Sequence, residues 1–286
     1  MVHETPSAAV CATCSTPLAT HFCAECGEKR LDHHDLSLKH FFEHAFEAFA
    51  HFDSTILRTV RALLTSPGQL TVHWSEGRRK PFMPPVQLFL VCNVFYFLMH
   101  SLAPWNTLTT DLDTHMNGTK HSTFATDRVN KKLQERGTDL EHYRLKFDAK
   151  SETQAKSLVI LMVPLFALTV ALVQIGLRRY FVEHLVFSLH FYAFFLVFLS
   201  FFTVSFTGIV KVLAAQGVRL SGQSVDNIAS VALLTGCATY LFRALRTAYH
   251  QSWWITAVKS AVLCWVLVEV IYAYRFALFL VTFRSA

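Results

Sequence analysis

Four cysteines near the N-terminus have the spacing of a tetrahedral metal site. Residues 11–30 read CATCSTPLATHFCAECGEKR and contain two Cys-x2-Cys pairs. The first pair is Cys11 and Cys14, and the second is Cys23 and Cys26. Each pair can place two thiolates on one Zn2+ ion at about 2.3 Å per sulfur. Gly27 follows the last cysteine, where a residue without a Cβ can adopt the turn that points backbone N–H groups at the sulfurs.

The cysteine spacing predicts a zinc ribbon over residues 1–30, with Zn2+ as the bound metal. A segment this short has no hydrophobic core, so the metal must provide most of its folding free energy. A rubredoxin-like iron site is the alternative metal centre, and a pair of disulfides is the alternative in an oxidising compartment. The first ten residues lack the basic start and apolar run of a signal peptide, which favours a cytoplasmic N-terminus.

A second set of candidate residues consists of polar side chains within long apolar segments. Such groups are costly in a bilayer, and they usually face the protein interior or a water-filled path. Carboxylates and imidazoles can bind zinc and carry protons. The alternative for each is structural, as an interhelical hydrogen bond or ion pair, or as an arginine that reaches outward to the interface. The candidates for an intramembrane polar site are Glu183, His184, His190, Glu269, Arg275, Asn93 and His100.

The spacing of these residues limits how they can act together. Glu183 and His190 share a helix face but are separated by about 10 Å of helix rise, so one metal cannot bind both without ligands from other helices. Glu269 lies near the middle of the last apolar segment, and Arg275 follows six residues later. Six residues rotate a helix by roughly 240°, so these two side chains need separate partners on other helices.

The composition requires a membrane around these elements. Hydrophobic residues make up 52% of the 286 residues, 26 of them are Phe, and only 16% are charged, against about 25% in soluble domains. Such a chain needs a lipid bilayer as its solvent. The net charge of +6 comes from basic residues near helix ends, which indicates membrane anchoring, and nucleic acid is not expected as a partner.

The apolar segments predict a mainly α fold, a polytopic membrane bundle over residues 84–286. It contains about five transmembrane helices, at about 85–102, 157–177, 184–210, 227–242 and 255–283. A polar loop over 103–156, with helical character from about 122 to 152, separates the first two. Arg78, Arg79 and Lys80 precede the first span and favour its cytoplasmic end there. An odd number of spans then places the loop and the C-terminus outside the cytoplasm.

Residues 31–83 are predicted to form amphipathic helices at the membrane interface. Apolar residues recur at helical spacing between 38 and 52 and give a Phe-rich face suited to the cytoplasmic interface. Packing of this face against the bundle is the alternative. Asp53 has the position of an N-cap for a second helix at about 55–65, which the Ser66-Pro67-Gly68 sequence ends.

Several blocks of the sequence together resemble one known family. They are the ribbon pattern Cys-x2-Cys…Phe-Cys-x2-Cys-Gly, His-Phe-Asp at 51–53, Arg-Thr-Val-Arg-Ala-Leu-Leu-Thr-Ser-Pro-Gly at 58–68, Gly-Arg-Arg at 77–79 and Glu-His-Leu-Val-Phe-Ser-Leu-His at 183–190. This order resembles domain-of-unknown-function family 3667, which comprises bacterial zinc-ribbon polytopic membrane proteins. The resemblance covers most of the chain and implies a multi-pass protein of the bacterial inner (cytoplasmic) membrane, but no mechanism.

The sequence leaves three classes of function open. In the first, the ribbon is a structural or partner-docking cap, and the bundle transports or otherwise handles a small solute, ion or lipid. In the second, Glu183, His184, His190 or Glu269 surround a second metal in a membrane-embedded metal-dependent enzyme. In the third, the protein is a zinc-sensing or regulatory scaffold. The chain has no nucleophile elbow, P-loop, dinucleotide fingerprint or His-Glu-x-x-His motif. Its expected partners are the lipid bilayer, a protein bound at the ribbon, and a second copy in a homo-oligomer.

Overall fold

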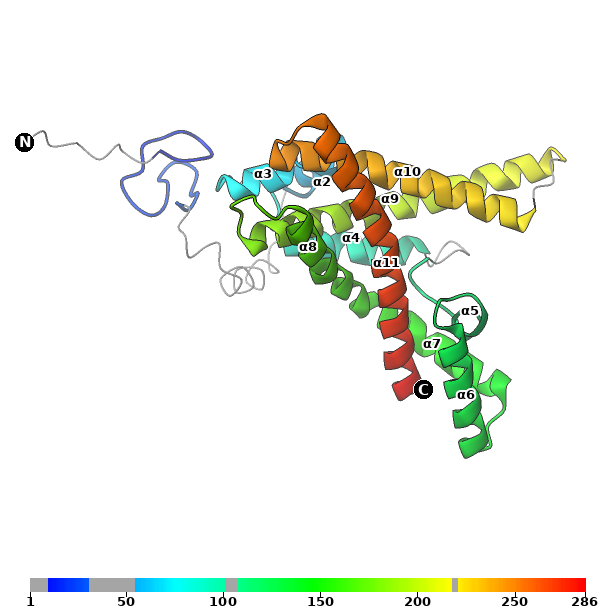
Figure 1. The fold of residues 1–286 in the computed structure, drawn as a ribbon. Helices are drawn as coiled ribbons and strands as arrows, with labels where there is room; N and C mark the ends of the chain where they lie inside the picture. The colour runs from blue at the N-terminus through cyan, green and yellow to red at the C-terminus, as the bar shows by residue number, and fades with distance from the viewer. Residues whose placement is uncertain (1–9, 31–54, 101–106, 218–220) are drawn as a thin grey trace, which may run out of the picture.

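The computed structural model describes residues 10–30, 55–100, 107–217 and 221–286 (Figure 1). These residues are mainly helical, and their only β-pairing consists of two isolated bridges in the ribbon, Val10 with Pro17 and Phe22 with Lys29. The prediction of a mainly α fold with an N-terminal ribbon is confirmed. The predicted interfacial helix between 38 and 52 and the N-cap at Asp53 lie outside the described residues.

Four helical stretches are long and apolar enough to cross a membrane. They are Leu140–Val173, α9 (Phe181–Ala215), α10 (Gly222–Tyr249) and α11 (Trp253–Ser285). The first predicted span is also helical, as α4 (Pro85–His100), but its 16 residues reach only about 24 Å, less than the roughly 30 Å of a hydrocarbon core. The chain is therefore a multi-helix membrane protein, and the part of it that the structure describes contains four long apolar helical stretches and one shorter apolar helix.

The stretch Leu140–Val173 joins a polar helix to an apolar one. It consists of α7 (Leu140–Leu158), a 3-10 turn η3 (Val159–Leu161) and α8 (Met162–Val173). Pro164 lies in the first turn of α8 and has no N–H to donate to residue 160, which accounts for the tighter turn just before it. Residues of α7 include seven charged side chains, so we place the start of the apolar part near residue 157, as the sequence predicted.

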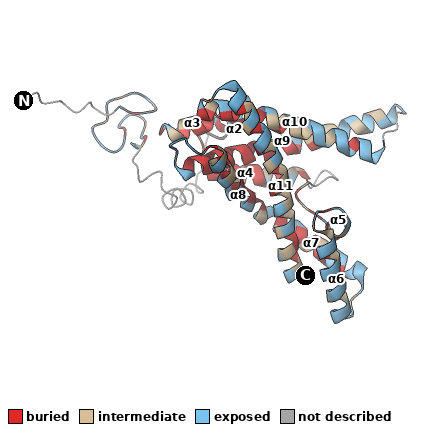
Figure 2. Cartoon of the chain, viewed as in Figure 1, coloured by how far each residue is buried: buried red, intermediate tan, exposed pale blue. Residues whose placement is uncertain are grey.

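The N-terminal half of α9 lies at the centre of the bundle. Its residues from Val182 to Val197 are all buried, against α4 and α8 (Figure 2). Aromatic rings fill much of this core, for example Phe166 of α8 stacked on Phe191 at 5.0 Å between centroids. The C-terminal half of α9 is much more exposed and extends with the N-terminal part of α10 away from the other helices (Figures 1 and 2).

Two short helices that precede α4 pack on this bundle. They are α2 (Thr55–Thr65), which ends where the sequence predicted, and α3 (Gln69–Ser75). Gly68 between them has φ +85, and a Cβ at this position would lie 2.5 Å from the backbone oxygen of Ala244 in α10. The turn therefore requires glycine both for its backbone conformation and for the close approach to α10.

A second, smaller core lies beside the C-terminal half of α11. It is built from α5 (Leu112–Asn117), α6 (Ser122–Arg136), the start of α7 and the end of α11. Lys132 of α6 donates to the backbone oxygen of Phe283 at 2.6 Å, so α6 and α11 lie side by side, as Figure 1 shows. We call residues 107–158 the polar segment. The predicted loop over 103–156 is therefore largely helical, and α11 continues along it.

Candidate metal centre and the buried polar residues

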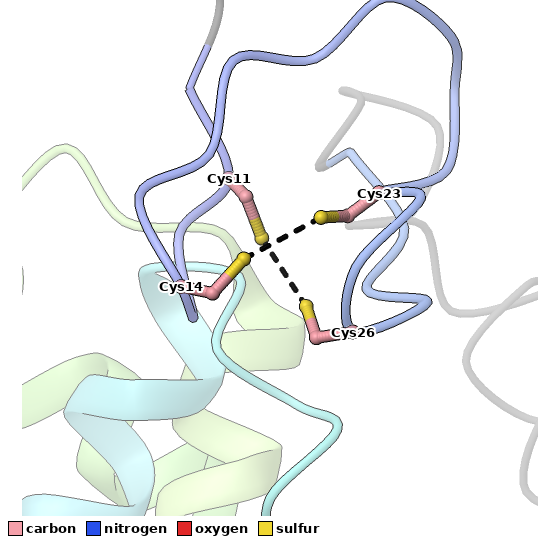
Figure 3. A group of neighbouring side chains, drawn as sticks. All are labelled: Cys11, Cys14, Cys23 and Cys26. Carbon is pink, nitrogen blue, oxygen red and sulfur yellow. Dashed lines mark hydrogen bonds between the residues drawn. The ribbon is translucent and has the colours of Figure 1, made fainter.

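The four cysteine sulfurs of the ribbon converge on one point. Their Sγ atoms all lie within 4.8 Å of one another (Figure 3). Cys11 and Cys26 are 3.5 Å apart, and Cys14 and Cys23 are 3.4 Å apart. All four are free thiols. Sulfurs bound to one Zn2+ at 2.3 Å would be about 3.8 Å apart at the corners of a tetrahedron, so the donor set fits a tetrahedral thiolate metal centre.

Each Cys-x2-Cys pair sits in its own tight turn. The N–H of Ser15 donates to the Cys11 carbonyl at 2.9 Å, and the N–H of Gly27 donates to the Cys23 carbonyl at the same distance. In each turn the residue that follows the second cysteine has a left-handed backbone conformation, with φ +63 at Ser15 and +69 at Gly27. The turn predicted at Gly27 is confirmed. Ser15 occupies the same position in the first turn. The left-handed conformation strains the backbone of a residue with a Cβ, and it persists only where the surrounding structure compensates for this cost.

One thiol of the group is biased toward the thiolate. Hydrogen bonding to the side chain and backbone of Thr16 lowers the pKa of Cys14 to about 6. The thiolate is the form that binds metals. The pKa of Cys26 in the same group is raised by burial and by the other three thiols, so the shift at Cys14 does not extend to the whole group.

The ribbon is attached to the rest of the chain through Glu28. This side chain is buried, and its Oε2 atom accepts three hydrogen bonds. The Thr13 hydroxyl donates from the other turn of the ribbon at 2.7 Å, and the backbone N–H groups of Arg79 and Lys80 donate at 3.1 and 2.8 Å. We call this set of contacts the Glu28 clamp. It joins both halves of the ribbon to the loop between α3 and α4.

The loop that the Glu28 clamp contacts is fixed from its other side as well. The guanidinium of Arg79 lies 4.2 Å from the ring centroid of Trp74 in α3. The N–H of Met83 donates to the hydroxyl of Thr59 in α2 at 2.9 Å. The loop ends at Pro85, the first residue of α4. The ribbon thus contacts the chain directly before its first apolar helix.

Sequence reasoning did not identify Glu28 as a functional residue. The nearest signal was its place two residues after Cys26, within a ribbon that otherwise carries few charges. Its partners are backbone N–H groups 51 and 52 residues away, and no pattern in the sequence pairs them with a carboxylate.

The predicted polar residues of α9 have separate structural partners. Glu183 accepts from the N–H of Tyr180 at 3.0 Å and pairs with Arg179 at 2.9 Å, which caps the start of α9. His184 Nδ1 is 2.8 Å from the Tyr249 hydroxyl at the end of α10. His190 Nδ1 is 2.9 Å from the Thr71 hydroxyl in α3.

The remaining candidates lie near the polar segment. Asn93 of α4 donates to the Lys156 carbonyl at 2.8 Å, and His100 packs against Tyr96 at 4.2 Å between ring centroids. Glu269 pairs with Lys120 at 2.7 Å, and Arg275 donates to the Thr107 carbonyl at 3.1 Å. The partners of Glu269 and Arg275 are therefore residues of the polar segment.

The structure does not gather the predicted intramembrane residues into one metal-binding group. Among the residues that the structure describes, the four cysteines are the only group of three or more His, Cys, Asp or Glu side chains with ligand atoms close enough to share an ion. Each membrane candidate instead contacts a different neighbour. A role for them in catalysis or in solute handling stays a prediction.

Comparison with known proteins supports the resemblance seen in the sequence. Residues 53–97 match the family described as protein of unknown function (DUF3667). The matched segment contains α2, α3, the loop contacted by Glu28 and most of α4. Searches of curated proteins and of solved structures give no significant match.

Proposed function

We propose that this protein, a chain with a DUF3667 segment at residues 53–97, is a membrane scaffold whose zinc-loaded ribbon fixes the loop that leads into α4. The Glu28 clamp is the observation that carries the proposal. A buried carboxylate that accepts three hydrogen bonds holds two parts of the chain in one relative position, because leaving either side unpaired costs roughly 1–3 kcal/mol.

In this proposal Zn2+ is the resident metal of the cysteine group. It supplies the bonds that hold the two turns of the ribbon together, since four thiolates and little else connect them. Thr13 belongs to the first turn and Glu28 to the second, so the clamp needs both turns in place. Loss of the metal would separate the two turns and release the loop. The conformation of the loop before α4 would therefore depend on whether the ribbon holds its metal.

The membrane residues support a scaffold rather than a transport path or a second catalytic metal. Glu183, His184 and His190 join α9 to its own N-terminus, to α10 and to α3. Such contacts determine how the helices pack. In this proposal these residues maintain the packing of the bundle. The functional surface is the ribbon with the loop before α4, whose conformation depends on the bound metal.

The proposed placement follows the charges around the ribbon. Arg78, Arg79 and Lys80 lie beside the ribbon and directly before α4, which favours a cytoplasmic location for this end in a bacterial inner membrane. The domains would then be the ribbon at 1–30, the interfacial helices at 31–83 and the bundle at 84–286. The polar segment and the end of α11 would lie outside the cytoplasm.

Hydrogen–deuterium exchange of the full-length protein in detergent tests the proposal. The amides of residues 76–84 should be protected with zinc bound and should exchange at least several-fold faster in the Glu28→Gln variant, which weakens the acceptor. Glu25→Gln is the matched control, because Glu25 is exposed and belongs to the same turn. Equal protection in the wild type and in Glu28→Gln would refute the clamp.

A further inference from the structure

Two histidines contact each other inside the polar segment. His115 of α5 is completely buried, and its Nδ1 atom is 3.0 Å from the Nε2 atom of His121, which precedes α6. Their distance requires one ring to donate an N–H and the other to accept it. The pair therefore contains one neutral acceptor, and it loses this hydrogen bond when both rings are doubly protonated.

The pair joins α5 and α6 to α11. His115 packs on Phe279 of α11 at 5.3 Å and on Phe147 of α7 at 5.8 Å between ring centroids. His121 packs on Phe276 of α11 at 5.2 Å. Phe147 and Phe279 belong to the second core, so the histidine pair lies within the contact of α5 and α6 with α11.

The charges around the pair oppose a second proton. Arg275 of α11 acts on both imidazoles and lowers their affinity for protons. Asp111, the N-cap of α5, is the acidic group that acts in the opposite direction on His115. The carboxylate of Asp148 in α7 accepts from the N–H of Leu112, and Glu269 of α11 is paired with Lys120.

The pKa of His115 is lowered to about 3, mainly by burial and further by charge repulsion from His121 and Arg275. Burial and then Arg275 also lower the pKa of His121. An exposed histidine has a pKa near 6.5. The closed arrangement is consequently favoured above pH 6.5, where both rings are neutral and one donates its N–H to the other. It loses stability as the pH falls from about 6.5 toward about 3, because an opened segment takes up protons that the closed one rejects.

We propose that His115 and His121 form a proton-sensitive latch that holds α5 and α6 against α11 at neutral pH and releases them in acid. This inference is independent of the ribbon, and it does not require the proposed scaffold function. The packing of the polar segment on α11 would thus depend on the pH of the compartment that surrounds it.

Exchange protection of residues 112–121 in the full-length protein, corrected for intrinsic rates, tests the latch at pH 7.5 and pH 5.0. His115 alone should increase the opening constant roughly 30-fold over this range, from an open-state pKa near 6.5. His142→Asn is the control, because His142 is exposed on α7 and should leave the response unchanged. His115→Asn/His121→Asn should remove the pH response.

A measurement on the unaltered protein covers the case in which the double variant fails to fold. Proton NMR of the imidazole C–H groups should show one histidine that stays neutral well below pH 6.5 until the segment opens. Equal protection of the wild type at both pH values, or titration of His115 near pH 6.5 in the closed protein, would overturn the proposal.

Discussion

The carboxylate of Glu28 accepts a hydrogen bond of 2.8 Å from the backbone N–H of Lys80, 52 residues further along the chain. One residue of the contact lies two positions after Cys26 of the candidate metal centre, and the other lies five positions before α4. This contact joins the ribbon that holds the candidate metal centre to the loop that leads into α4. Because the acceptor atom is buried and the donor belongs to the backbone, substitution of Lys80 itself should leave the contact in place.

The Thr71 to His190 contact should contribute to stability. Thr71→Val would leave the Nδ1 atom of a buried histidine without its partner and should destabilise the protein by about 1–3 kcal/mol. Thermal unfolding in detergent measures this as a lower Tm. Thr65→Val is the control, because Thr65 is exposed at the end of α2. An unchanged Tm in Thr71→Val would contradict a structural role for His190.

The turn at Gly68 should not accept a side chain. Gly68→Ala would force a residue with a Cβ into φ +85 and place that atom 2.5 Å from the Ala244 oxygen, with an expected cost of at least about 2 kcal/mol. Gly137→Ala separates the two causes, since Gly137 also has positive φ but has open space around it. Thermal unfolding should show a larger loss for Gly68→Ala, and equal losses would mean that α2 and α3 do not pack on α10 as described.

The ion pair between Lys120 and Glu269 should contribute little. Both side chains are substantially exposed, at 58% and 40%. Where this exposure is to water, pairs of this kind are worth about 0–1 kcal/mol. A double-mutant cycle with Lys120→Met and Glu269→Gln, read by thermal unfolding, should give a coupling energy in this range. A coupling energy of several kcal/mol would indicate that Glu269 lies in a far less polar environment than its exposure suggests.

Much of this fold follows from local features of the sequence. The two Cys-x2-Cys pairs predict the metal centre because the ligands of each pair are neighbours in the chain. The helix at Thr55–Thr65 is bounded by a Pro-Gly breaker, and the apolar segments are visible as uninterrupted runs. Helical character in the polar loop, between about 122 and 152, was also predictable from its composition.

The contacts on which the two proposals rest are not local, and the sequence does not reveal them. The partner of Glu28 is a backbone group in a distant loop, and the partner of Glu269 is a lysine 149 residues away. His115 and His121 are close in sequence, but their burial depends on α7 and α11, which arrive much later in the chain. The extension of α11 along the polar segment is likewise a tertiary feature that its apolar sequence does not predict.

The central claim, that bound zinc fixes the loop before α4, is tested most directly by one titration. Full-length protein stripped of metal would receive Zn2+ in measured steps, while metal content and exchange of residues 76–84 are followed together. We expect one zinc per chain and loop protection that rises in proportion to occupancy, with both lost when Cys11, Cys14, Cys23 and Cys26 are changed to Ser. Loop protection that is already complete without metal, or zinc binding that leaves it unchanged, would contradict the account.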